Sequence, residues 1–96
     1  MSGELLRAAY SVLLPAIGDL NLDEPVRRHL SRGGVSVLLG ETRDEYIGRA
    51  MTQARRDAET QTKLASLTQH VAALAGGPVL IAVDQELGGI ERLHQL

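Results

Sequence analysis

The sequence has 96 residues, a formal net charge of -2 and no cysteine. This length is typical of one domain, and a hydrophobic content of 44% excludes a disordered chain. The weak negative charge gives no electrostatic reason to expect nucleic acid, and no apolar run approaches the roughly 20 residues that span a bilayer. Without cysteine there are no disulfides and no thiolate metal sites, so we expect a cytoplasmic protein.

The first predicted element is a helix over Gly3–Leu13, where apolar residues recur at helical spacing. A short apolar stretch, Ala16–Leu20, predicts a strand. Asp23 is the expected N-cap of a second helix that runs to about Ser31. Gly33-Gly34 then ends that helix, because glycine readily takes the backbone conformation found after a helix.

Two strong strand signals flank the longest helical pattern. Val35–Leu39, VSVLL, is nearly all apolar and β-branched, which indicates a strand. From Asp44 to Ala75 apolar residues recur mostly at three- and four-residue spacing, which predicts a long helix. Its polar, threonine-rich middle at Glu59–Lys63 favours a kink or an interruption. Pro78–Val83, PVLIAV, is the strongest strand prediction in the chain.

Helices and strands therefore alternate along the chain, and both strong strands are continuously apolar. Such strands are buried on both faces and belong to parallel sheets covered by helices, so we predict an α/β fold. A closed (β/α)8 barrel takes about 250 residues. Three strands alone leave an edge without a partner. We expect the chain to be the incomplete first part of a larger fold.

Reactive groups in parallel α/β folds gather at the carboxyl ends of the strands, and Asp84–Arg92 is the richest such segment here. The Asp84 carboxylate can accept hydrogen bonds from two vicinal hydroxyls, and the Arg92 guanidinium supplies several donors. Together they suit a polyhydroxylated ligand. The structural alternative, of about equal weight, is that Asp84 caps the next turn while Arg92 pairs with Glu86 at the surface.

Other charged residues give weaker signals. His29, His70 and His94 are widely scattered and form no metal-binding pair, so we interpret them as exposed or helix-terminal side chains. Arg55 and Arg56 fit a solvated helix face. We expect no metal and no cofactor.

Residues Val79–Glu86, VLIAVDQE, with Gly88 and then Ile90–Leu93, IERL, resemble the strand-and-loop signature of glycoside hydrolase family 3, close to AVDQEGGRVxRL. Within that family the sequence is most similar to bacterial β-N-acetylhexosaminidases. Upstream, Gly33–Gly40, GGVSVLLG, resembles the family's G-G-x-x-L-F strand. The resemblance covers most of the chain from Asp23 onward.

The resemblance implies that residues 1–96 are the N-terminal portion of a TIM-type (β/α)8 barrel. It implies a retaining β-glycosidase that acts on terminal β-N-acetylglucosaminides through a glycosyl-enzyme intermediate. Asp84 would bind hydroxyls of the non-reducing sugar, and Arg92 would help to shape the same pocket. In the family the nucleophilic aspartate and the acid/base histidine lie downstream of this region. No catalytic residue is therefore assigned, and the 96-residue chain alone is expected to be inactive.

One stretch departs from the family. Leu87-Gly88-Gly89 stands where the family has Gly-Gly-Arg, which removes a guanidinium from the pocket rim and alters the backbone freedom of the loop. This change motivates an alternative, a non-catalytic carbohydrate-binding or regulatory relative of the same fold. A third reading is a small α/β interaction protein that self-associates to cover its sheet. The expected partner is a small carbohydrate, with no nucleic acid and no membrane.

Overall fold

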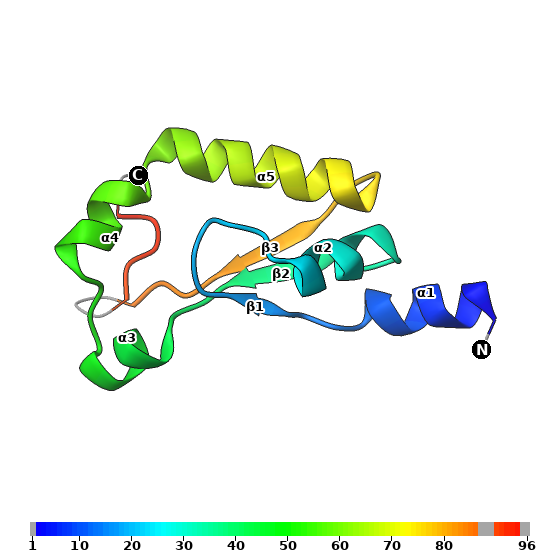
Figure 1. The fold of residues 1–96 in the computed structure, drawn as a ribbon, viewed down its shortest axis with the longest axis horizontal. Helices are drawn as coiled ribbons and strands as arrows, with labels where there is room; N and C mark the ends of the chain where they lie inside the picture. Colours follow the sequence, from blue (N-terminus) through cyan, green and yellow to red (C-terminus); the bar gives the residue numbers. More distant parts are fainter. Residues whose placement is uncertain (1, 87–89, 95–96) are drawn as a thin grey trace.

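A three-stranded parallel sheet and five helices make up the protein in a computed structural model, which describes residues 2–86 and 90–94. The elements follow in the order α1 (Gly3–Ser11), β1 (Ala16–Ile17), α2 (Glu24–Ser31), β2 (Ser36–Leu39), α3 (Arg43–Gly48), α4 (Gln53–Ala58), α5 (Gln61–Ala75) and β3 (Leu80–Val83). The strand order is β1-β2-β3 (Figure 1). The predicted α/β class and the parallel pairing are confirmed, and closure into a barrel stays a prediction.

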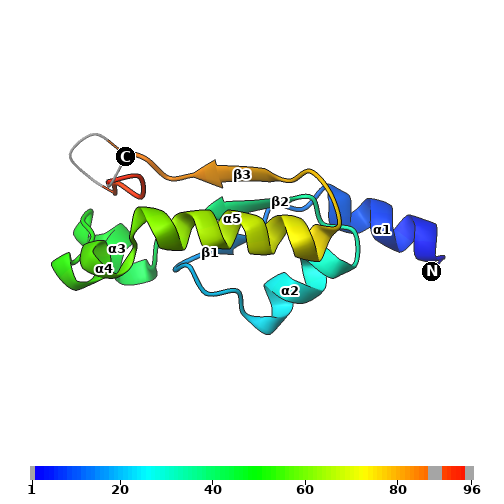
Figure 2. The same cartoon turned by 90° about the horizontal axis from the view of Figure 1, so that it is seen from above.

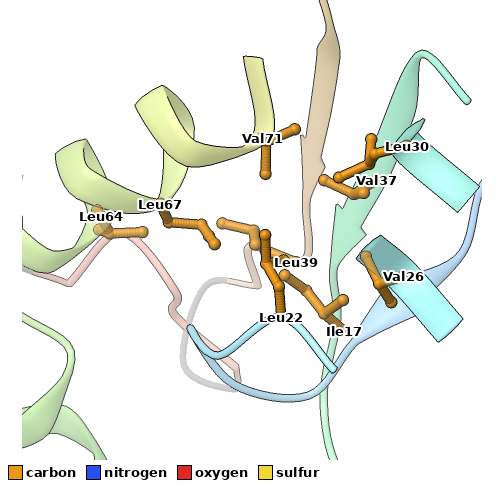
Figure 3. Packing of buried hydrophobic residues seen from close by; sticks show 9 residues of the cluster. All are labelled: Ile17, Leu22, Val26, Leu30, Val37, Leu39, Leu64, Leu67 and Val71. Atoms are coloured by element: carbon orange, nitrogen blue, oxygen red, sulfur yellow. The ribbon is translucent and has the colours of Figure 1, made fainter. Parts of the chain in front are cut away.

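The two longer crossover helices, α2 and α5, pack on the same face of the sheet and contact each other (Figure 2). Alternate strand residues point to this covered face. Figure 3 shows the core that results, in which strand residues meet leucines and valines of both helices. The buried core residues are Ile17, Leu22, Val26, Leu30, Val37, Leu39, Leu64, Leu67 and Val71.

The opposite face of the sheet carries the remaining strand residues. Ala16, Leu38 and Ala82 lie in one row across the three strands, because Ala16 pairs with Leu38 and Leu38 pairs with Ala82. Ala16 is exposed and Leu80, in the next row, is 66% exposed. Only one side of the sheet is therefore covered by α2 and α5. The prediction that β3 is buried on both faces is wrong for the described part of the chain.

Threonine caps divide the long predicted helix into three. Thr42, Thr52 and Thr60 each accept a hydrogen bond from the backbone N–H three residues later, and so begin α3, α4 and α5. Arg49 takes the left-handed conformation with φ of 53° just after α3. The single helix expected over residues 44–75 is thus corrected, although the break at Glu59 agrees with the expected interruption.

The helix α1 differs from expectation in its packing. It ends at Ser11 and not at Leu13, and no residue in it is buried. Leu5 is 58% exposed and Leu13 is 53% exposed, so its apolar positions do not face a core. The first strand is also shorter than predicted, since it ends at Ile17.

At the amino ends of the strands, hydrogen bonds from side chains to backbone carbonyls connect the helices and strands. The buried His29 in the last turn of α2 hydrogen-bonds through Nε2 to the Ser36 carbonyl at 3.1 Å, and the Ser36 hydroxyl donates to the Leu13 carbonyl at 3.0 Å. A Cβ at Gly34 would lie 2.3 Å from His29 Nε2. Glycine at this position therefore gives the imidazole the space that it occupies.

Candidate functional site

The carboxyl ends of the strands form the opposite end of the molecule, where α3, α4 and the C-terminal segment gather (Figure 1). Asp84 directly follows β3, and its backbone N–H donates to the Leu39 carbonyl at 2.9 Å. A Cβ built at Gly40 lies 3.4 Å from the Ala16 Cβ and 3.6 Å from Asp84 Oδ2. The half-buried Asp84 side chain therefore lies on the open face of the sheet, beside Gly40 and one row beyond the Ala16–Leu38–Ala82 row.

Asp84 belongs to an acidic rim, which we define as Glu41, Asp84 and Glu86. Partial burial, and then the negative charges of Asp84 and Glu86, raise the pKa of Glu41 above its ordinary value. Glu86 is exposed, and its backbone N–H donates to the Ile90 carbonyl at 2.6 Å. The rim thus presents hydrogen-bond acceptors beside an uncovered sheet face.

Arg92 lies at the same end of the sheet, but it is completely buried, with 0% exposure. Its Nη1 donates to the Gly18 carbonyl at 3.3 Å and to the Gly40 carbonyl, and its Nη2 donates to Glu59 Oε1 at 2.8 Å. The alternative in which Arg92 pairs with Glu86 at the surface is therefore wrong. Arg92 holds together the residues that follow β1 and β2.

Glu59 connects Arg92 to α4 and α3. Its Oε1 also accepts from Arg55 Nη2 at 3.1 Å, and Arg55 Nη1 bonds Glu45 Oε1. Glu45 Oε1 in turn accepts from the Thr42 backbone N–H at 2.8 Å, which completes a capping box at the start of α3. We call Glu45, Arg55, Glu59 and Arg92 the buried ion network.

The buried ion network is electrically balanced but costly to desolvate. The side chains of Glu45 and Glu59 are each 5% exposed and that of Arg55 is 13% exposed. Burial lowers the pKa of Arg92, and the charge of Glu59 partly offsets this effect. Among the described residues, no partner reaches Glu45 Oε2, Glu59 Oε2 or Arg92 Nε.

A hollow of about 560 Å³ opens near the buried ion network, between the β1–α2 loop and the helices α4 and α5. Its polar lining includes Arg55 and Glu59 of the buried ion network, together with Asp19, Asn21, Thr42, Lys63, Ser66 and His70. Neither Asp84 nor Arg92 is among the lining residues. The hollow is therefore separate from the acidic rim.

The three histidines take ordinary structural places. His70 is exposed and His29 is helix-terminal, as predicted, although His29 is also buried. His94 hydrogen-bonds through Nδ1 to the Glu91 carbonyl at 3.0 Å and through Nε2 to the Arg56 carbonyl at 2.8 Å. In the described part of the chain, no group of three His, Asp or Glu side chains is arranged to hold a metal ion.

Three of the four network residues were missed by the sequence analysis, which placed Arg55 on a solvated helix face. Two local signals were available, since Thr42-x-x-Glu45 is a capping-box pattern and Arg55 lies four residues before Glu59. Neither reveals burial, because the contact to Arg92 joins positions 33 residues apart. The departure at Leu87-Gly88-Gly89, and with it most of the turn that Asp84 was predicted to cap, lies outside the described residues.

Across residues 2–86 and 90–94, no helix is both long enough and apolar enough to cross a membrane. No protein-family model, curated protein or solved structure matches this chain. The arrangement of the residues at the carboxyl ends of the strands must therefore carry the functional argument, together with the sequence motif around Asp84.

Proposed function

We propose that this chain is the N-terminal part of a retaining β-glycosidase of the (β/α)8 type that hydrolyses terminal β-N-acetylglucosaminides. The observation that carries the proposal is the place of Asp84. Its carboxylate follows a parallel strand directly and lies on the sheet face that α2 and α5 leave uncovered. Ligands of parallel α/β folds bind at this end of the sheet.

The chemistry of the acidic rim agrees with a sugar ligand. A carboxylate accepts strong hydrogen bonds from hydroxyl groups and can accept from two vicinal hydroxyls together. The backbone N–H of Asp84 is bonded to the Leu39 carbonyl. On the open face, the carboxylate would accept from the hydroxyl groups of a ligand. The sequence VLIAVDQE, in which Asp84 stands, resembles the sugar-binding segment of glycoside hydrolase family 3.

The packing of both crossover helices on one face of the sheet also supports the proposed (β/α)8 barrel. In a (β/α)8 barrel every crossover helix packs outside a sheet whose other face lines the interior. Here both crossover helices pack on one face, and the other face is lined by small or apolar side chains such as Ala16, Leu38 and Ala82. Both outer edges of this sheet would pair with further strands in such a barrel.

The proposal is tested with the full-length gene product that contains this chain. We expect it to hydrolyse aryl β-N-acetylglucosaminides, and residues 1–96 alone to be inactive. Asp84→Ala removes the carboxylate and should weaken binding of N-acetylglucosamine at least about tenfold, the effect of losing a hydrogen bond to a charged group. Asp44→Ala, at an exposed carboxylate of the same end of the sheet, is the matched control. Absence of hydrolysis together with unchanged sugar binding in Asp84→Ala contradicts the proposal.

A second function, a carbohydrate-binding relative without hydrolytic activity, is favoured by the altered Leu87-Gly88-Gly89 segment. The same experiment separates the two. Binding of N-acetylglucosamine that depends on Asp84, without release of the aryl group, identifies the non-catalytic relative.

A further inference from the structure

The buried ion network forms a closed circuit around the carboxyl end of β2. From Gly40 the circuit continues through Thr42 to Glu45, whose carboxylate bonds Arg55. It returns through Glu59 to Arg92, which donates to the carbonyl of Gly40 itself. The circuit therefore joins α3, α4 and the segment after β3 around a single residue.

Gly40 is also the residue that Asp84 approaches. The Arg92 guanidinium bonds the carbonyl of Gly40, while Asp84 Oδ2 lies 3.6 Å from the position of a Cβ on the same residue. The ion network and the acidic rim thus meet on two sides of one backbone unit. We therefore expect a displacement of Arg92 from Gly40 to shift the Asp84 carboxylate as well.

A second path connects the two residues through the chain. Glu86 N–H donates to the Ile90 carbonyl, and Gln85 forms an antiparallel bridge with Glu91. The Gln85 side chain accepts from Leu93 N–H at 3.0 Å. Residues 90–94 therefore lie beside residues 84–86. Leu93 packs against the core, and Arg92 bonds the residues that follow β1 and β2.

The observed contacts of Arg92 are made within the chain. Its exposure is 0%, and both terminal nitrogens already donate to protein acceptors. An ion network at this depth also contributes little net stability against an apolar core of the same volume. Its contacts with the residues that follow β1 and β2 fit a role in placing other groups.

We infer that Arg92, Glu59 and Arg55 are positioning residues of the Asp84 site: they hold residues 90–94, and through them residues 84–86, against the ends of β1 and β2. The identity of the ligand rests on the proposed function. The positioning role does not rest on the proposed function, because it is defined by contacts within the chain.

The decisive variant is Glu59→Gln, which keeps the shape of the side chain and removes its charge, so that two guanidinium groups share one carboxylate. Amide hydrogen exchange in residues 1–96 is the first readout. We expect exchange at Asp84, Glu86 and Leu93 to become about tenfold faster, while amides of α5 keep their rates. Glu24→Gln, which alters an exposed pair with Arg28, is the control. Unchanged exchange at the three amides overturns the inference.

If Glu59→Gln does not fold, the paired variant Glu59→Leu with Arg92→Leu replaces it, since removal of both partners leaves no buried charge. The same three amides should exchange about tenfold faster in this paired variant. Wild-type exchange rates there overturn the inference.

The second readout is the affinity for N-acetylglucosamine in the full-length gene product. Glu59→Gln should weaken binding when Asp84 is present and have no further effect in the Asp84→Ala background. An equal effect in both backgrounds overturns the positioning role. If Asp84→Ala alone leaves sugar binding unchanged, the proposed function fails, and the exchange experiment still decides the positioning.

Discussion

The two ends of the sheet are held together by different kinds of contact. At the amino ends, the His29 and Ser36 side chains hydrogen-bond to backbone carbonyls, and the Tyr10 ring meets the His29 ring edge-on at 5.9 Å. At the carboxyl ends, two guanidinium and two carboxylate groups are buried together. A side-chain hydrogen bond to a backbone carbonyl needs only space and a matched donor. A buried ion that lacks a partner, in contrast, destabilises the folded structure. The costly arrangement lies at the end where parallel α/β folds bind ligands.

We expect the largest change in the free energy of unfolding when a charge of the buried ion network is removed. Arg92→Met leaves Glu59 buried with one cation fewer and removes the donor to Gly40 and Gly18. We expect a loss of about 3–5 kcal/mol in the free energy of unfolding, measured by urea denaturation. A loss below about 1 kcal/mol, the size of an exposed pair, would contradict the description of this network as buried and coupled.

At the amino ends of the strands, we expect added side-chain volume, and not a change of charge, to destabilise the fold. Gly34→Ala places a Cβ on the buried His29 ring, so we expect a loss of about 1–3 kcal/mol in the free energy of unfolding. The clash is relieved when the ring is removed, and Gly34→Ala should therefore cost less in a His29→Ala background. An equal cost in both backgrounds would assign the effect to another cause.

A smaller effect tests the acidic rim. A carboxyl group whose pKa is raised on folding, as for Glu41, favours the folded state at low pH. That contribution is lost as pH rises from the ordinary carboxyl value, about 4.3, through the folded pKa. Asp84→Asn removes one of the charges that raise it. An NMR titration should then give a lower pKa for Glu41 than in the wild type.

Asp44→Asn is the control for this titration, because Asp44 is not among the groups that raise the pKa of Glu41. If the pKa of Glu41 is the same in Asp84→Asn and in the wild type, the charge of Asp84 does not act on Glu41 and Asp84 does not belong to the acidic rim.

The smallest effect is expected at the surface of α2. Arg28 Nη2 lies 3.7 Å from Glu24 Oε1, and both side chains are at least half exposed. Arg28→Met should change the free energy of unfolding by less than about 0.5 kcal/mol in the same urea experiment. A loss comparable to that of Arg92→Met would remove the distinction between surface and buried pairs.

Elements with local signals were predicted well from the sequence. Asp23 is the N-cap of α2, with its side chain accepting from Val26 N–H at 3.1 Å, and α5 ends at the predicted Ala75. Both features depend on a few neighbouring residues. The break between α4 and α5 agrees with the interruption expected at Glu59–Lys63. The break between α3 and α4 was missed, because a threonine at an N-cap and a threonine inside a helix look alike in the sequence.

The candidate site was predicted in part. Asp84 lies at the end of a parallel strand because strand and loop are adjacent in the chain, and the strand signal was strong. The place of Arg92 was missed, because burial of an arginine depends on partners such as Glu59 and Gly18 that are far away in sequence. Its predicted role as a sugar ligand stays a prediction, and its observed contacts are all within the chain.

The contact between Arg92 and Gly18 has a consequence for the order of folding. It spans 74 positions, so the circuit around Gly40 closes only after nearly the whole segment has been made. During synthesis, β1, α2 and β2 leave the ribosome well before Arg92 does, and N-terminal parts generally fold first. Loop-closure entropy also delays contacts between distant positions. Until Arg92 is in place, Glu45, Arg55 and Glu59 carry an excess of negative charge that water must solvate, so we expect the Asp84 segment to become ordered after β1, α2 and β2.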